Sequence, residues 1–304
     1  MEPQYPPYVI ATPVRDEVSR LPELLRCVEG LEPRPVIWVI VDDGSRDGSR
    51  EWLKERAAEH PWMRVFDAPE AADEYLGGHI ARIKRWGLEQ AVTLGDALGR
   101  RVVHAGVLDA DVELPPDHYA RLMEAFAARE RLGIVSSVMA LRGPSGLEPE
   151  PYQREDLPMG PTQFFRRACL DEIGGLPPWP GFDGAANVKA QMRGWETALV
   201  PDVIAVHTRP TATRFGHAQG FERKGRYAWF LGIHPLLVVA RSAAYTCEVP
   251  HTSGWHFLRG WAMEAARRGP RCPDPEIRRG YGLRRVVKAA GARLMMGTRY
   301  VARR

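Results

Sequence analysis

The sequence predicts an α/β protein with a mostly parallel central sheet flanked by helices. Over the first 140 residues, short apolar segments alternate with segments of helical periodicity, and acidic residues and glycines follow two of the apolar segments. The chain has 304 residues, of which 44% are hydrophobic and 26% charged, enough for one large or two modest domains. Such alternation is typical of βαβ units, in which a helix connects two parallel strands.

The predicted elements follow one another with short connections. Strands are expected where short apolar segments occur, at residues 8–12, 36–41, 63–66, 102–108, 133–139 and 198–206. Helices are expected where apolar residues recur at helical spacing, at residues 21–31, 49–59, 78–98 and 116–128. Residues 143–158 are interpreted as a loop.

Two adjacent carboxylates, Asp42 and Asp43, end the second predicted strand and precede Gly44 and Ser45. These residue types favour a turn or a helix cap and do not continue a strand. In open α/β sheets, ligands bind in a crevice beyond the carboxyl ends of the strands. The sequence therefore predicts a ligand site at this turn.

A second acidic pair, Asp109 and Asp111, follows the strand predicted at residues 102–108. Side chains at positions i and i+2 of an extended segment share one face. Two carboxylates on one face are suited to a hard divalent cation such as Mg²⁺ or Mn²⁺, with diphosphate oxygens completing the coordination shell. An isolated Asp-x-Asp is weak as a signal, but the preceding strand and the Asp42-Asp43 turn strengthen it.

Together these segments resemble family 2 glycosyltransferases. The resemblance rests on residues 10–17 (IATPVRDE), 41–49 (VDDGSRDGS), 108–111 (LDAD), 160–167 (GPTQFFRR) and 173–176 (IGGL), and it covers roughly residues 8–215. It implies a GT-A fold in which residues 1–112 form the nucleotide-sugar-binding half and residues 113–215 the acceptor-binding and catalytic half. It also implies metal-dependent, inverting transfer of a sugar from a nucleoside-diphosphate sugar to an acceptor hydroxyl or lipid phosphate.

The resemblance assigns a role to each candidate residue. The nucleotide would be contacted by Thr12, Pro13, Arg15, Glu17, Asp42, Asp43 and Asp109, with Thr12 and Pro13 placed in a turn. The metal ion, Mg²⁺ or Mn²⁺, would be held by Asp109, Asp111 and His207. The diphosphate or the acceptor would meet Arg209, Arg223, Lys224 and Arg226. From the long helix at 78–98, His79, Arg82, Lys84 and Arg85 are further candidates to line the donor pocket.

Asp183 is the candidate catalytic base, because it stands eleven residues before Gly194, as the catalytic Asp of the family precedes the end of its helix. Its alternative role is to cap the helix that follows. The family often has Glu-Asp at this place, whereas this chain has Phe182-Asp183, and Ala186 and Asn187 stand where relatives often carry acids. A lipid-phosphate acceptor is already a nucleophile and needs no base.

Residues 216–304 are expected to form a helical, basic and amphipathic extension. Residues 259–304 contain 13 Lys or Arg and three acidic residues, a net charge of +10 that leaves −6 for the remainder. The apolar segment 227–240 contains His234 and Pro235 and is too short to span a bilayer, which requires about 20 apolar residues. We expect a helix broken at the proline and a basic tail that meets an anionic membrane surface; the alternative is a solvated helix packed on the core.

Other function classes remain as alternatives or are disfavoured. A non-catalytic binding or scaffold protein on the same fold is the main alternative, and a sugar nucleotidyltransferase is weaker because residues 10–15 lack glycine. A dinucleotide oxidoreductase is disfavoured because no Gly-x-Gly-x-x-Gly follows an early strand. A nucleic-acid-binding protein is disfavoured because no recognised binding motif accompanies the basic charge. Four dispersed cysteines and an amino terminus without a basic and apolar leader favour a cytoplasmic protein at the inner face of the cell membrane, acting on a lipid-linked or membrane-proximal acceptor.

Overall fold

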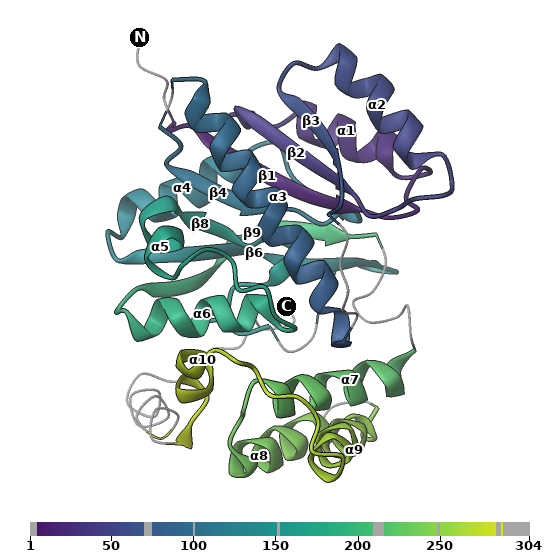
Figure 1. The fold of residues 1–304 in the computed structure, drawn as a ribbon, viewed down its shortest axis with the longest axis vertical. Helices are drawn as coiled ribbons and strands as arrows, with labels where there is room; N and C mark the ends of the chain where they lie inside the picture. Colours follow the sequence, from purple (N-terminus) through teal and green to yellow (C-terminus); the bar gives the residue numbers. More distant parts are fainter. Residues whose placement is uncertain are drawn as a thin grey trace.

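The computed structural model describes residues 5–69, 75–99, 101–150, 153–208, 216–247, 250–283 and 287. A twisted sheet with helices on both faces forms the larger part of the molecule, and helices α7 to α10 gather at one end of its long axis (Figure 1). Within the described residues the sheet has nine strands, in the order β3-β2-β1-β4-β8-β6-β9-β5, with β7 paired to β6.

The first half of the sheet is parallel, as predicted. Its strands are β1 (Tyr8–Val14), β2 (Ile37–Asp42), β3 (Met63–Asp67) and β4 (His104–Val107). The helices that connect them are α1 (Leu21–Glu29), α2 (Ser49–Glu59) and α3 (Gly78–Ala97). Each lies within a few residues of its predicted bounds, because period-2 and period-3.6 apolar patterns are both strong here.

The two faces of the sheet are buried under different helices, because successive side chains of a strand point to opposite faces. On one face, Ile10 and Ile40 join a core with apolar residues of α1, α2 and α4 (His118–Ala128). On the other face, Val9 and Val39 pack with α3, α5 (Arg167–Glu172) and α6 (Phe182–Met192). Both strands are thus buried on both faces, which explains their continuous apolar sequence.

The second half of the sheet mixes strand directions. Strands β6 (Leu132–Gly143) and β9 (Glu196–His207) are parallel, and β8 (Phe164–Arg166) runs antiparallel to both β4 and β6. At the end of the sheet, β5 (Val112–Glu113) pairs antiparallel with β9. The short 3-10 turn η2 (Gly160–Thr162) precedes β8 and crosses the carboxyl end of β4.

The loop predicted at residues 143–158 is partly wrong. Residues Gly146–Pro149 form strand β7, which turns back on β6 through Gly146, whose φ of 123° suits glycine. Beyond the hairpin, Gln153 both donates to and accepts from the backbone of Met139. The segment carries little apolar periodicity of its own, so pairing to the long β6 strand decides its structure.

Four helices make up the described part of the C-terminal extension: α7 (His217–Phe230), α8 (Pro235–Thr246), α9 (Ser253–Ala266) and α10 (Pro275–Gly280). The predicted break in 227–240 is confirmed, since α8 begins at Pro235, where a missing backbone N–H costs nothing. Helices α7 and α9 pack closely, because a Cβ at Gly225 would lie 1.9 Å from the carbonyl oxygen of Phe257.

The expectation of one basic amphipathic helix over the tail is wrong for its described part. Pro270 and Pro273 separate α9 from α10, and proline cannot continue a helix. The basic residues Arg284, Arg285 and Lys288 lie outside the described residues. Among the helices that the structure describes, none is both long enough and apolar enough to cross a bilayer.

Candidate active site

A cavity of about 230 Å³ opens where strands β1 and β4 end. Most of the candidate donor and metal residues converge on its wall, which is built from four separate segments of the chain. The cavity is lined by Pro13, Val14, Arg15, Glu17, Asp43, Ile80, Lys84, Asp109, Ala110 and Asp111. The parallel half of the sheet produces this convergence, since it aligns the carboxyl ends of its strands at one edge.

The two loops that carry Glu17 and Asp43 are locked together. Asp16 has a left-handed backbone, with φ of 55°, and its carboxylate accepts from the backbone N–H of Arg46 at 2.8 Å. In return, Asp47 accepts from the backbone N–H of Val18 at 2.9 Å. Residues 44–49 (GSRDGS) thus hold the loop after β1 against the loop after β2 at the cavity wall.

The acidic pair at the end of β2 has divided roles. Asp42 is fully buried and forms an ion pair with Arg50 at 2.9 Å, so it supports the turn and does not line the cavity. Asp43 faces the cavity, where His79 lies 2.5 Å and Arg15 3.4 Å from its carboxylate oxygens. Of the two predicted nucleotide contacts, only Asp43 is placed to meet a ligand.

Thr12 and Pro13 lie inside β1 and not in a turn, which corrects the prediction for both residues. The Thr12 side chain is fully buried, and its hydroxyl accepts a hydrogen bond from the indole N–H of Trp38 at 2.9 Å. Because Thr12 points into the core, it holds β1 against β2. Pro13 and Arg15, which follow it, do line the cavity.

Lys84 of α3 forms an ion pair with Asp109 on the opposite side of the cavity. Only 4% of the Lys84 side chain is exposed, and its ammonium lies 4.7 Å from the ring centre of Phe182. Lysine is almost never buried to this extent unless it is paired. Of the basic candidates on the long helix, Lys84 lines this cavity, whereas Arg82 and Arg85 line other cavities.

His207 ends β9 and lies next to the acidic segment after β4, since the backbone N–H of Thr208 donates to the carbonyl of Asp111 at 3.0 Å. Its Nδ1 is hydrogen-bonded to the buried carboxylate of Glu150. Burial lowers the pKa of His207, but the bond to Glu150 and the charges of Glu150, Asp111 and Asp109 outweigh it and raise the pKa above its usual value. Sequence reasoning gave no role to Glu150.

The residues around Asp109 fit a divalent cation. Mg²⁺ is typically bound by one or two protein carboxylates, with waters and substrate phosphates completing the shell, and Asp109 and Asp111 supply that number. The cavity already attracts a cation, because the Lys84 ammonium pairs with Asp109. Within the described ranges, no three His, Cys, Asp or Glu side chains form a ready metal cluster, so His207 is not joined to the two carboxylates as a preformed third ligand.

Asp183 occupies the first turn of α6, close to the cavity. The cap of α6 is Gly181, with φ of 72°, so the alternative in which Asp183 caps the helix is wrong. A Cβ at Gly160 would lie 3.3 Å from that of Asp183, and the carbonyl of the next residue, Pro161, accepts from the backbone N–H of Asp109 at 3.0 Å. Thus η2 brings the start of α6 next to the acidic segment after β4.

Asn187 has a structural role one helical turn further along α6. Its amide donates to the carbonyl of Pro158 at 3.0 Å and accepts from Gln163 at 3.1 Å, and the side chain is buried. An acidic side chain at this position would lose the bond to Pro158. The departure from the family pattern noted in the sequence therefore serves the packing of α6 against β8 and its preceding loop.

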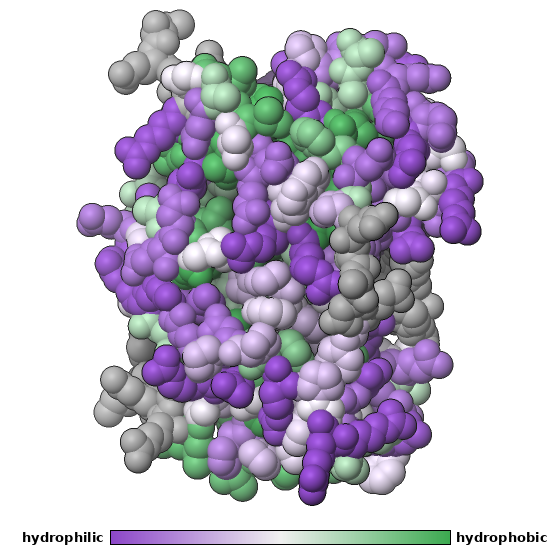
Figure 2. Space-filling view, in the orientation of Figure 1, coloured by the Kyte–Doolittle hydropathy of each residue, from purple (hydrophilic) through white to green (hydrophobic). Residues whose placement is uncertain are grey.

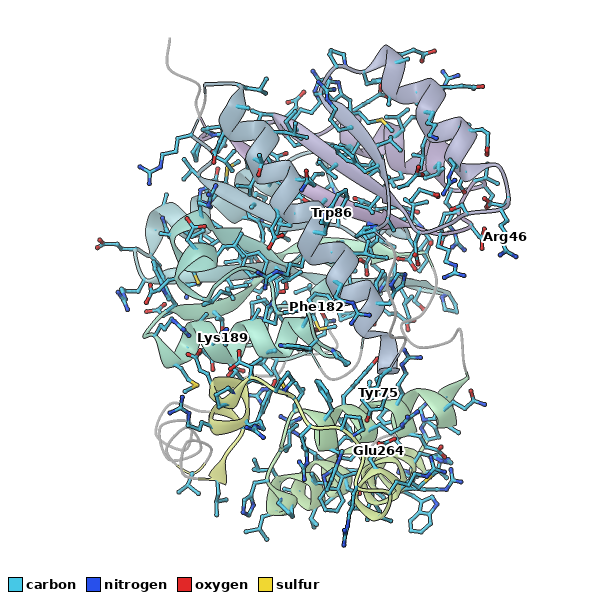
Figure 3. The ribbon with its side chains drawn as sticks, viewed as in Figure 1. Arg46, Tyr75, Trp86, Phe182, Lys189 and Glu264 are labelled. Carbon is cyan, nitrogen blue, oxygen red and sulfur yellow. The ribbon has the colours of Figure 1, made fainter. Side chains whose placement is uncertain are left out.

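The three basic residues of α7 are not among the residues that line this cavity, so their expected contact with diphosphate or acceptor stays a prediction. Arg226 forms an ion pair with the buried Glu264 of α9, which also accepts from Tyr75 at 2.9 Å (Figure 3). Arg223 donates to the hydroxyl of Tyr227, and the Lys224 ammonium lies 4.5 Å from the ring centre of Phe221. Burial lowers the pKa of Lys224. Arg226 thus helps to pack α7 against α9 within the helical unit formed by α7 to α10. Arg209 lies outside the described residues.

Comparison with known proteins identifies the family. The model of "Glycosyl transferase family 2" matches residues 9–178, which contain every residue that lines the cavity; His207 lies outside the matched range. This chain belongs to glycosyl transferase family 2.

Among curated relatives of this family 2 protein, an undecaprenyl-phosphate mannosyltransferase of Micrococcus luteus is 33% identical over 113 residues, which is 37% of this chain and 41% of the relative. An undecaprenyl-phosphate 4-deoxy-4-formamido-L-arabinose transferase of Pseudomonas aeruginosa is 37% identical over 136 residues, 44% of this chain and 35% of the relative. The match thus spans less than half the length of these curated relatives.

Solved structures show that the fold is GT-A. The mannosyltransferase PcManGT from Pyrobaculum calidifontis, solved with GDP-Man and Mn²⁺, superposes with a TM-score of 0.55 at 19% identity, covering 96% of this chain and 81% of its own. GalNAc-T7, solved with UDP, GalNAc and Mn²⁺, gives a TM-score of 0.57 at 13% identity, covering 98% and 59%.

Proposed function

We propose that this family 2 protein transfers a sugar from a nucleoside-diphosphate sugar to a lipid phosphate. The observation that carries the proposal is a single cavity in which Arg15, Lys84 and four carboxylates meet at the carboxyl edge of a GT-A sheet. Cations suit a diphosphate, whereas carboxylates suit ribose hydroxyls, base N–H groups and a divalent cation. The curated relatives support the choice of acceptor, since both are named as undecaprenyl-phosphate transferases.

In this proposal each wall of the cavity recognises one part of the donor. Asp43 and Glu17 accept hydrogen bonds from the nucleoside, and Pro13 packs against it. Arg15 and Lys84 contact the diphosphate, and Lys84 exchanges its pairing with Asp109 for pairing with phosphate oxygens. The donor site is therefore rigid on the side of the interlocked loops and electrostatically adjustable on the side of α3.

Asp109 and Asp111 would hold Mg²⁺ or Mn²⁺, and His207 would help through its Nε2, since Glu150 takes its Nδ1. When bound, such an ion supplies Lewis-acid stabilisation of the departing nucleoside diphosphate. The neighbours PcManGT and GalNAc-T7 were both solved with Mn²⁺, which supports a divalent ion without choosing between the two.

The transfer is proposed to be a single displacement with inversion at the anomeric carbon. An oxygen of the lipid phosphate attacks that carbon, a new C–O bond forms, and the bond to the diphosphate breaks so that the nucleoside diphosphate leaves. A phosphate oxygen is already ionised at neutral pH and requires no base, because its second pKa is about 6. Asp183 then positions the acceptor; it acts as a base only if the acceptor is a hydroxyl.

A lipid-linked acceptor implies work at a membrane surface. We propose that the protein is peripheral to the inner face of the cell membrane, with the sheet as its catalytic part and residues 216–304 as the membrane-proximal part. The basic charge of residues 259–304 supports this arrangement, since clusters of Lys and Arg attract anionic lipid.

The donor part is tested by a thermal-shift screen of nucleotides and nucleotide sugars with and without Mn²⁺. A ligand that binds only the folded protein raises its melting temperature. One nucleotide class should give a Mn²⁺-dependent rise that Asp111→Ala abolishes and Glu55→Ala, on the exposed face of α2, retains. No rise with any nucleotide would contradict transferase function and favour a scaffold on the same fold.

A further inference from the structure

Helix α8 is apolar on both of its faces, although only one of them is covered. On the inner face, Val238 is fully buried and Leu237 and Tyr245 pack with the core of the helical unit. On the outer face, 62% of Leu236 and 58% of Val239 are exposed. A helix that is apolar all round is normally enclosed on every side.

The outer face continues along the whole helix. Ala240, Ala243 and Ala244 are also exposed, four, seven and eight residues after Leu236, so they share its face of the helix. Arg241, five residues after Leu236, lies off this strip. Helix α8 lies at the end of the molecule farthest from α1 and α2, where a small patch of hydrophobic side chains shows among hydrophilic ones (Figure 1, Figure 2).

An exposed tryptophan flanks this strip. Trp255, in the first turn of α9, is 64% exposed. The preceding residue, Gly254, packs on α8: its carbonyl accepts from the hydroxyl of Ser242 at 2.8 Å. Trp255 therefore stands beside the C-terminal half of α8. Tryptophan is enriched at the boundary between water and the membrane interior.

Positive charge predominates around the strip: over the described part of residues 235–283, seven arginines stand against three acidic residues. The three acidic residues described in 235–283 all form ion pairs. Glu264 pairs with Arg226, and Asp274 pairs with Lys189 (Figure 3). Glu276 pairs with Arg193 and Lys189. The exposed basic residues of the same stretch are Arg267, Arg268, Arg271, Arg278 and Arg279, together with Arg259, which pairs with Glu222 of α7. An apolar strip within a basic surface matches the anionic surface of a bilayer.

We propose that α8 lies in the headgroup region of an anionic membrane, with Leu236 and Val239 facing the acyl chains, Trp255 at the polar boundary, and the arginines on lipid phosphates. The helix has 12 residues and is about 18 Å long, so it lies along the surface and does not cross it. The proposal adds the membrane partner to the function above, but it rests on surface chemistry alone and does not require transferase activity.

A second copy of the chain is a poorer occupant of the strip. In a two-fold dimer the same surface meets itself. Pairing two α8 helices face to face would bring the arginines of α9 and α10 in each copy close to those of the other, and like charges across an interface oppose association. An anionic lipid surface would cover the same apolar side chains, and its negative charges would attract the arginines that repel one another in a dimer.

The test is sedimentation of the full chain with vesicles of phosphatidylcholine alone or mixed with phosphatidylglycerol. The wild type should bind the mixed vesicles and release from them at high salt. The double substitution Leu236→Ser and Val239→Ser should weaken the partition coefficient about tenfold or more, because it removes two apolar side chains from the buried face. The control Leu98→Ser, an exposed leucine that follows α3, should bind as the wild type does.

Other outcomes have defined meanings. Equal binding by the wild type and the double variant, or no binding to anionic vesicles, would overturn the proposal, as would a wild-type dimer in solution that the double variant dissociates. The melting temperature of the double variant confirms its fold. Its Mn²⁺-dependent shift with nucleotide should be unchanged, so a failure of donor binding and a failure of membrane binding are separately visible.

Discussion

Lys84 and Asp109 form an ion pair across the candidate donor cavity, although one belongs to helix α3 and the other follows strand β4. The Lys84 ammonium can pair with Asp109 of the predicted metal-binding segment or with the diphosphate of a ligand. When it pairs with the diphosphate, the Asp109 carboxylate becomes available to a metal ion.

Replacing Lys84 tests this relationship. Lys84→Met should weaken binding of a nucleoside diphosphate by about 10- to 100-fold, because a hydrogen bond to a charged group contributes roughly 1.5–3 kcal/mol. Titration calorimetry with the nucleotide found by thermal shift measures the change. Lys54→Met, at an exposed position of α2, is the matched control and should bind normally. Unchanged affinity in Lys84→Met would remove Lys84 from the donor site.

Asp183 distinguishes the two acceptor classes. With a lipid phosphate, Asp183→Asn should lower the transfer rate by less than about tenfold, because no proton must be removed. With a hydroxyl acceptor, loss of a general base should cost about 10²- to 10⁴-fold. Single-turnover transfer to a polyprenyl phosphate gives the answer, and a loss above a hundredfold would argue against the phosphate as nucleophile.

His207 should make stability depend on pH. Its pKa in the folded protein is raised, so the protonated form is stabilised by folding; that contribution is complete below the unfolded pKa of about 6.5 and disappears as pH rises through the folded pKa. Urea unfolding of the wild type and His207→Gln should show a difference at pH 6 that shrinks by pH 9. In a Glu150→Gln background, the difference in unfolding free energy that His207→Gln causes at pH 6 should also be smaller. A difference that grows with pH would be inconsistent with the raised pKa of His207.

Thr12 should act on stability and not on specificity. In Thr12→Val the buried indole N–H of Trp38 loses its acceptor, which costs about 1–3 kcal/mol of unfolding free energy. Thr93→Val, at an exposed position of α3, should change stability much less. Chemical denaturation followed by circular dichroism compares the two variants. A stable Thr12→Val with weakened nucleotide binding would restore Thr12 to the donor site.

Much of the fold was predictable because β1 and β2 are buried on both faces and read as continuous apolar segments, while α1 and α3 show helical spacing. The hairpin β6–β7 was missed since its second strand is exposed and gains its structure only by pairing. The prediction of one continuous helix in the tail was wrong because it rested on the basic composition of the tail, whereas Pro270 and Pro273 end the helix between α9 and α10.

The convergence of acidic residues on one cavity could be predicted from the sequence, whereas the placement of the cations could be predicted less well. Asp43, Asp109 and Asp111 follow strand ends, and the parallel topology alone brings such positions together. Burial separates Asp42 from Asp43, and no local pattern shows which of two neighbouring carboxylates points inward. Glu150 and Lys84 come from distant segments, so their pairing with His207 and Asp109 required the tertiary structure.

The most direct test of the central claim is transfer of radiolabelled sugar from a nucleoside-diphosphate sugar to a polyprenyl phosphate by the wild type and by Asp111→Asn, with Mn²⁺ or with a chelator. We predict that labelled lipid forms only with the wild type and Mn²⁺, because Asp111 lies at the donor cavity with Asp109. Equal transfer by Asp111→Asn, or lipid labelling that the chelator leaves unchanged, would contradict the account.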